Sequence, residues 1–136
     1  MKIAGHRPKV LVMENEPLIA LDLIDALEKA CFEVVGPWTT IERAERELSA
    51  PVSFDAAVID LKLADGHAGA IAQRLLNEAI PVVIASAWGN AEVVAALPQA
   101  VFFAKPYRSA EVVAAVVQAT ARVPDVRQSA NVMSAS

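Results

Sequence analysis

Polar residues that could carry out chemistry stand directly after four short apolar runs of this sequence. They are Glu14, Asn15, Glu16, Asp60, Ser86 and Lys105. Carboxylate and amide oxygens are the hard ligands that Mg²⁺ prefers in proteins. Asp60 is the candidate nucleophile, because attack on a phosphoryl group depends on positioning and charge neutralisation more than on proton transfer. Lys105 and Mg²⁺ would neutralise the phosphoryl oxygens, and the Ser86 hydroxyl would donate a hydrogen bond to one of them.

These residues can meet only if the apolar runs are strands of one sheet. The runs cover 10–13, 34–35, 56–59, 82–85 and 101–104, and they alternate with segments of helical periodicity. Continuous apolar runs indicate strands that are covered on both faces. Five strand–helix units therefore predict a parallel sheet with right-handed crossovers. Ligands bind such sheets outside the carboxyl ends of the strands, where the polar residues stand.

Local signals predict where some elements begin and end. Pro17 is favourable at the first position of a helix and predicts the start of the first one. The second run is expected to end at Gly36 and Pro37. Thr39 and Glu42 have the spacing of a capping box, which predicts the start of the second helix.

Length and charge limit the class of protein. The chain has 136 residues, of which 55% are hydrophobic, and this suits one domain. We expect a flexible N-terminus at 1–7, a domain at 8–122 and a loose C-terminal tail at 123–136. The net charge of −4 argues against nonspecific binding of nucleic acid, which needs a basic surface.

The single cysteine, Cys31, cannot form an internal disulfide, so we expect a reducing compartment. We predict that it is buried in a helix, as free cysteines usually are. The apolar runs are all shorter than the roughly 20 residues that span a bilayer. The sequence therefore predicts a cytoplasmic protein without membrane contacts.

Four stretches carry a resemblance to a known family. VLVMENEPLIA, AAVIDLKLADG, VVIASA and FFAKPY resemble the four sequence blocks of receiver domains in two-component signalling, and the resemblance covers about residues 8–122. It implies a flavodoxin-like (CheY-like) α/β fold with a five-stranded parallel sheet of order 2-1-3-4-5 and helices on both faces. It also implies a stand-alone response regulator, phosphorylated by a histidine kinase or a histidine phosphotransfer protein.

The resemblance assigns roles around the phosphoryl group. Asp60 matches the phospho-acceptor and Lys105 the lysine that binds the phosphate. Ser86 matches the hydroxyl-bearing switch residue, and Phe102 the aromatic residue that moves with it. Ala87 matches the small residue whose backbone N–H approaches the phosphate.

The resemblance also implies a set of metal ligands, and this sequence departs from it at one position. The implied ligands are Glu14, Asn15, Asp60 and the backbone carbonyl of Lys62. The family usually has aspartate where this chain has Asn15, which offers a carbonyl oxygen but no charge. The absence of the aspartate's negative charge should weaken Mg²⁺ binding roughly 10–100-fold. Trp88 and Pro106 are expected to flank the site.

Three other polar residues receive a structural interpretation. Glu16 is interpreted as the N-cap of the first helix or as a partner of its dipole. His6 lies in the expected flexible start, and His67 in the turn after Gly66. We expect neither histidine to take part in the chemistry.

We expect phosphorylation to act through a change of surface. It would draw Ser86 inward, let Phe102 pack behind it and alter the face made by the fourth helix, fifth strand and fifth helix. That face would control a protein partner that the sequence does not identify, and the chain would be a monomer or a phosphorylation-dependent dimer. The chain would not be an enzyme beyond catalysing its own phosphorylation and dephosphorylation.

Two alternatives remain open at this point. Asn15 favours a receiver-like binding or adaptor protein that does not depend on phosphorylation. A haloacid-dehalogenase-like phosphatase also uses a strand-end aspartate with Mg²⁺. That family has a second aspartate, the acid/base, where this chain has Lys62.

Overall fold

The computed structural model describes residues 7–87 and 91–121. The predicted C-terminal tail at 123–136 and nearly all of the predicted N-terminal segment, including His6, lie outside these residues. Five strands form the main sheet: β1 (Lys9–Met13), β2 (Glu33–Trp38), β3 (Ala56–Ile59), β6 (Val82–Ser86) and β7 (Val101–Ala104). The helices are α1 (Pro17–Lys29), α2 (Ile41–Leu48), α3 (Gly69–Asn77), α4 (Ala91–Ala96) and a last helix at 109–121.

The strand order confirms the predicted fold class. The sheet runs β2-β1-β3-β6-β7, and every neighbouring pair is parallel. Two further strands, β4 (Lys62–Leu63) and β5 (Gly66–His67), form a separate antiparallel hairpin that the sequence did not predict. When the five strands of the main sheet are numbered by themselves along the chain, their order is the expected 2-1-3-4-5.

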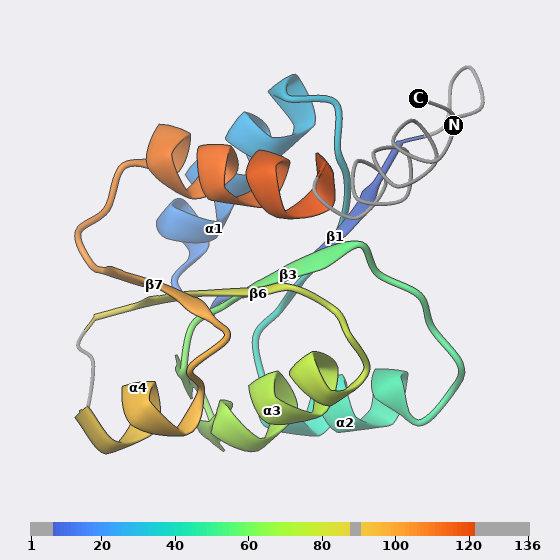
Figure 1. Cartoon of the computed structure of the whole chain (residues 1–136), viewed down its shortest axis with the longest axis vertical. Coiled ribbons are helices and arrows are strands. Elements are labelled where there is room, and N and C mark those ends of the chain that lie inside the picture. The colour runs from blue at the N-terminus through green and yellow to red at the C-terminus, as the bar shows by residue number, and fades with distance from the viewer. Residues whose placement is uncertain (1–6, 88–90, 122–136) are drawn as a thin grey trace, which may run out of the picture.

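Each central strand is buried on both faces, which explains its continuous apolar run. In β1, Val10 and Val12 pack in the cluster that contains residues of α1 and of the last helix. Leu11 and Met13 point the other way and pack with residues of α2, α3 and α4. Figure 1 shows this three-layer arrangement, with α1 and the orange-red last helix on one side of the sheet and α2, α3 and α4 on the other.

Strand β2 is longer than predicted. It passes through Gly36 and Pro37 and ends at the buried Trp38, with a register irregularity opposite Leu11 and Met13 of β1. Proline is tolerated here because β2 is an edge strand. Gly36 has φ +118°, and an added Cβ would lie 2.4 Å from the carbonyl oxygen of Val12, so a side chain cannot be accommodated without a backbone shift.

The N-terminus of α2 differs from the capping box that the sequence predicts. Thr40, not Thr39, is the N-cap, and its Oγ1 accepts a hydrogen bond from the backbone N–H of Arg43 at 3.1 Å. The β4–β5 hairpin adds a second cap. Asp65 Oδ1 accepts from the N–H of Ile41 at 2.6 Å, and Asp65 Oδ2 accepts from the N–H of Glu42 at 3.1 Å.

Cys31 is exposed, so the prediction that it is buried in a helix was wrong. It follows the C-terminal end of α1 with φ 71°, in the turn that leads to β2. Among the described residues, no helix combines the length and the apolar character that crossing a bilayer requires.

Candidate functional site

The carboxyl ends of four parallel strands bring the predicted residues together. Met13 pairs with Ile59, and Ile59 pairs with Ile84, so the residues that follow these strands leave the sheet at one edge. Ser86 pairs with Ala104 in the same way, and the backbone N–H of Lys105 donates to the carbonyl of Ser86 at 2.7 Å. The topology that the apolar runs predicted therefore builds one polar cluster.

Asp60 lies at the centre of this cluster and is only 4% exposed. Its Oδ1 accepts hydrogen bonds from the Ser86 hydroxyl at 2.8 Å and from the backbone N–H of Lys62 at 3.1 Å. Its Oδ2 lies 2.8 Å from the Nζ of Lys105. A buried carboxylate is tolerated only when it is paired and hydrogen-bonded in this way.

Lys105 contacts three carboxylates at once, and its side chain is only 9% exposed. Besides Asp60, its Nζ lies 2.9 Å from Glu14 Oε1 and 2.8 Å from Glu16 Oε2. Burial alone would lower the pKa of Lys105, but the hydrogen bonds to Asp60, Glu16 and Glu14 together raise it well above its ordinary value. The ammonium is therefore fully charged at neutral pH.

Glu14 is buried at the end of β1. Burial raises its pKa above the ordinary value, and the nearby charge of Asp60 raises it further. Hydrogen bonds from the backbone N–H of Glu16, at 3.0 Å, and from Lys105 oppose this shift. The site thus holds a carboxylate whose charge is disfavoured by its surroundings and stabilised mainly by its hydrogen-bond donors.

The structure adds a contact to the N-cap position that the sequence suggested for Glu16. It occupies the N-cap position of α1, but its side chain makes no capping hydrogen bond and contacts Lys105 instead. Carboxylate oxygens of Glu14, Glu16 and Asp60 all lie within 4.8 Å of one another. A group of three hard oxygen donors fits Mg²⁺, the metal that the fold family implies.

The other predicted site residues lie around this cluster. Asn15 is half-buried beside Glu14, and Ala87 is exposed after β6. Lys62 turns its backbone N–H toward Asp60, and the role of its carbonyl as a metal ligand stays a prediction. Pro106 is exposed next to Lys105, and Trp88 lies outside the described residues.

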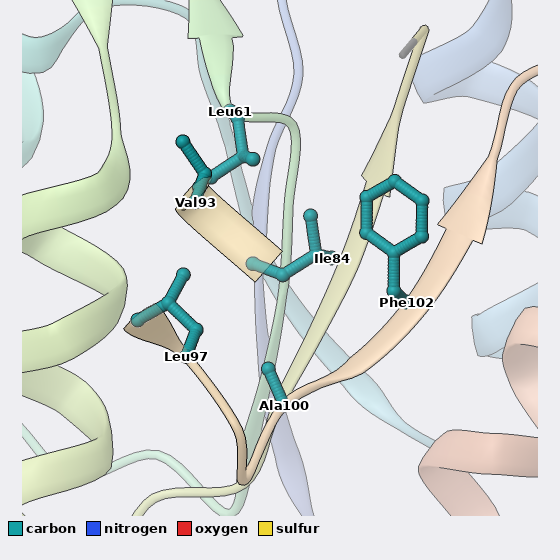
Figure 2. Close-up of a pocket in the computed structure, with 6 residues that line it drawn as sticks. All are labelled: Leu61, Ile84, Val93, Leu97, Ala100 and Phe102. Carbon is teal, nitrogen blue, oxygen red and sulfur yellow. The ribbon is translucent and has the colours of Figure 1, made fainter. Parts of the chain in front are cut away.

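Phe102 lies on β7, which β6 separates from β3, the strand that ends before Asp60. It is half-buried on β7, where it lines a cavity of about 10 Å³ together with Ile84 of β6, Val93 of α4 and Leu97, which follows α4. Figure 2 shows the ring beside Ile84, with Val93 and Leu97 across the cavity. Phe102 is therefore placed between the sheet and α4, in the part of the molecule that the predicted switch would alter.

Tyr107 is a nearby residue that the sequence analysis did not single out. Its hydroxyl oxygen is buried and has no hydrogen-bond partner among the described residues. Burial raises the pKa of Tyr107 to about 12, with a further contribution from the charge of Glu14. Only its position two residues after Lys105 could have drawn attention to it.

Comparisons with known proteins agree with this architecture. No family model matches the chain. The regulator PhyR of Methylorubrum extorquens is 32% identical over 108 residues, which are 77% of this chain and 40% of PhyR. The HemR receiver domain of Leptospira biflexa is 26% identical, with a TM-score of 0.72 over 84% of this chain and 94% of that domain.

A second solved structure repeats the likeness. A response regulator receiver protein of Sinorhizobium medicae superimposes with a TM-score of 0.74 at 23% identity, over 85% of this chain and 95% of that protein. The chain therefore has the fold of the receiver domains of response regulators. It spans 40% of the length of PhyR.

Proposed function

We propose that this receiver accepts a phosphoryl group on Asp60 from a phosphohistidine of a histidine kinase or a histidine phosphotransfer protein. One observation carries the proposal. The buried carboxylate of Asp60 is held between the Ser86 hydroxyl and the Lys105 ammonium, which are the two side chains needed to bind phosphoryl oxygens. The family to which the fold belongs is a signalling class, and the relative PhyR is a regulator.

The transfer needs few groups from the protein. A carboxylate oxygen of Asp60 attacks phosphorus, a P–O bond forms, and the P–N bond to the donor imidazole breaks, so that the imidazole leaves with the electron pair. Lys105 and Ser86 then exchange their contacts with Asp60 for contacts with the phosphoryl oxygens. Mg²⁺ held by the carboxylates would supply the remaining positive charge at those oxygens.

The surroundings of the site suit a protein as the donor. Glu14, Asn15 and Pro17 border an open groove of about 250 Å³ that continues along α1. Beside it, Leu18 is 81% exposed and Leu21 is 66% exposed. Exposed leucines next to an acidic site give a donor protein an apolar contact that could hold its imidazole in position.

The readout of phosphorylation would pass through Ser86. Its hydroxyl would turn from Asp60 to the phosphoryl group, and the packing of Phe102 between β6, β7 and α4 would change with it. A shift of this kind biases two arrangements of one surface. The proposed output face is therefore that of α4, β7 and the last helix, which binds an unidentified protein.

The test is direct labelling of the full chain with acetyl phosphate across a wide range of Mg²⁺ concentrations. We expect intact-mass analysis to show one added phosphoryl group that hydroxylamine removes. Asp60→Asn should abolish it, whereas Asp25→Asn, a surface change of the same type on α1, should leave it intact.

Failure to label the wild-type chain, with acetyl phosphate and with phosphohistidine donors, would contradict the proposal. It would favour the adaptor protein that Asn15 suggests. A stable adduct on any residue other than Asp60 would contradict the assignment of the acceptor.

A further inference from the structure

Asn15 leaves the receiver site one negative charge short of the pattern of its family, yet the site is not poor in charge. The carboxylate of Glu16, one residue further along the chain, reaches the same cluster and lies 2.8 Å from the Nζ of Lys105. We propose that Glu16, not Asn15, supplies the second anionic ligand for Mg²⁺, and that Mg²⁺ and the Lys105 ammonium compete for the same carboxylates. This inference deepens the proposed function and rests on it only in taking the cluster as a Mg²⁺ site.

The geometry supports the substitution of Glu16 for an acidic residue at position 15. Glu16 has no capping hydrogen bond to make, so its carboxylate is free of a structural task at the start of α1. Its oxygen lies within 4.8 Å of oxygens of Glu14 and Asp60, a spacing that one divalent cation can bridge. Asn15 contributes an amide carbonyl at most, which is a neutral ligand.

The position of Lys105 supports the competition. Its Nζ lies between 2.8 and 2.9 Å from one oxygen of each carboxylate, so the ammonium is the cation that balances the cluster in this structure. A metal that binds two or more of these oxygens must replace the ammonium at them. Mg²⁺ affinity therefore reports on Lys105 as well as on the carboxylates.

Glu16 is also a residue that can be changed without harming the fold. Its side chain is 55% exposed, and Glu16 belongs to neither of the apolar core clusters that the described residues form. Replacing it with glutamine keeps the shape and removes the charge. Glu28 offers a matched control, because it is an exposed glutamate in the last turn of the same helix.

The test is calorimetric titration of the full chain with Mg²⁺ in the absence of any phosphoryl donor. Glu16→Gln should weaken binding about 10–100-fold, the effect of removing one ligand charge. Asn15→Ala and Glu28→Gln should each change the affinity by less than about 3-fold, because neither removes a charge from the site. The double variant Asn15→Asp/Glu16→Gln should recover most of the lost affinity.

Lys105→Met tests the competition separately. Without the ammonium, the carboxylates should bind Mg²⁺ about 10-fold more tightly than in the wild-type chain. Circular dichroism of every variant verifies that it is folded, and Glu16→Gln decides the role of Glu16 even if Lys105→Met is unstable.

The inference would be overturned if the wild-type chain did not bind Mg²⁺, or if Glu16→Gln and Glu28→Gln had equal Mg²⁺ affinity. A loss of Mg²⁺ affinity in Asn15→Ala as large as that in Glu16→Gln would also overturn it. So would an unchanged Mg²⁺ affinity in a folded Lys105→Met. Labelling of Asp60 by acetyl phosphate is measured apart from this. Mg²⁺ binding that depends on Glu16 without labelling would contradict the proposed function alone. Labelling at Asp60 with Mg²⁺ binding that does not depend on Glu16 would contradict the inference alone.

Discussion

Two aspartates on either side of the β4 strand show how surroundings decide what a carboxylate does. Asp60 is buried, and two of its partners are the side chains of Ser86 and Lys105. Asp65 is exposed and accepts hydrogen bonds from the backbone N–H groups of Ile41 and Glu42 at the start of α2. Backbone donors at a helix terminus cannot be given up without loss of the cap, whereas side-chain donors can turn to a new ligand. Asp60 is thus suited to chemistry and Asp65 to structure.

The largest effect on stability should come from removing the cation of the buried cluster. Lys105→Ala leaves Glu14 and Asp60 buried without a counter-charge, so we expect the free energy of unfolding to fall by about 1–3 kcal/mol at neutral pH. Lys29→Ala is the control, because its ion pair with Asp25 is exposed and should contribute less than about 0.5 kcal/mol. Urea denaturation measures both, and equal losses would remove the distinction between buried and exposed charge.

Asp65 and Glu14 should make the free energy of unfolding depend on pH with opposite signs. The hydrogen bonds from Ile41 and Glu42 hold the pKa of Asp65 below its ordinary 3.8, so its contribution is complete above that pH and is lost as the pH falls further. Burial raises the pKa of Glu14 above 4.5, so its charge costs stability above the raised pKa, and the cost disappears as the pH falls toward 4.5.

Matched amide variants measure this difference. At pH 7, we expect Asp65→Asn to be less stable than the wild-type chain and Glu14→Gln to be more stable. Thermal unfolding at a series of pH values should show the advantage of Glu14→Gln shrinking toward pH 4.5, and the deficit of Asp65→Asn shrinking only below 3.8. Parallel curves for the two variants would show that burial does not separate these carboxylates.

The smallest expected effect is spectroscopic. Tyr107 is the only tyrosine in the chain, so phenolate absorbance reports on it alone. It should titrate near pH 12 in the folded protein, against an ordinary value of 10, and Glu14→Gln should lower that pKa because one charge near the phenol is lost. Titration at the ordinary value under conditions where the chain is folded would show that the phenol is not buried against the site.

Much of the fold could be predicted because its signals are local. Apolar runs at 10–13, 56–59, 82–85 and 101–104 predicted the strands, and parallel topology then required Asp60, Ser86 and Lys105 to leave the sheet at one edge. The structure places these three side chains in contact. Their roles in phosphoryl transfer stay predictions.

The parts that the sequence did not reveal depend on how distant segments approach one another. The direction of the Glu16 side chain is set by the angle at which α1 leaves β1, and no local pattern encodes that angle. Asp65 caps a helix that begins 24 positions earlier in the chain, so neighbouring residues gave no sign of it. At Gly36 the local signal was interpreted as the end of a strand, because the edge position of β2 becomes known only with the sheet assembled.

The hydrogen bonds of Asp60 have one more consequence. A carboxylate has about four lone-pair directions, and Ser86, Lys62 and Lys105 use three of them in the resting state. Among the described residues, the open direction is on Oδ2, the oxygen that also accepts a hydrogen bond from Lys105. An electrophile that approaches Asp60 can therefore reach Oδ2 without displacing a hydrogen-bond partner, and it meets the Lys105 ammonium at the same oxygen.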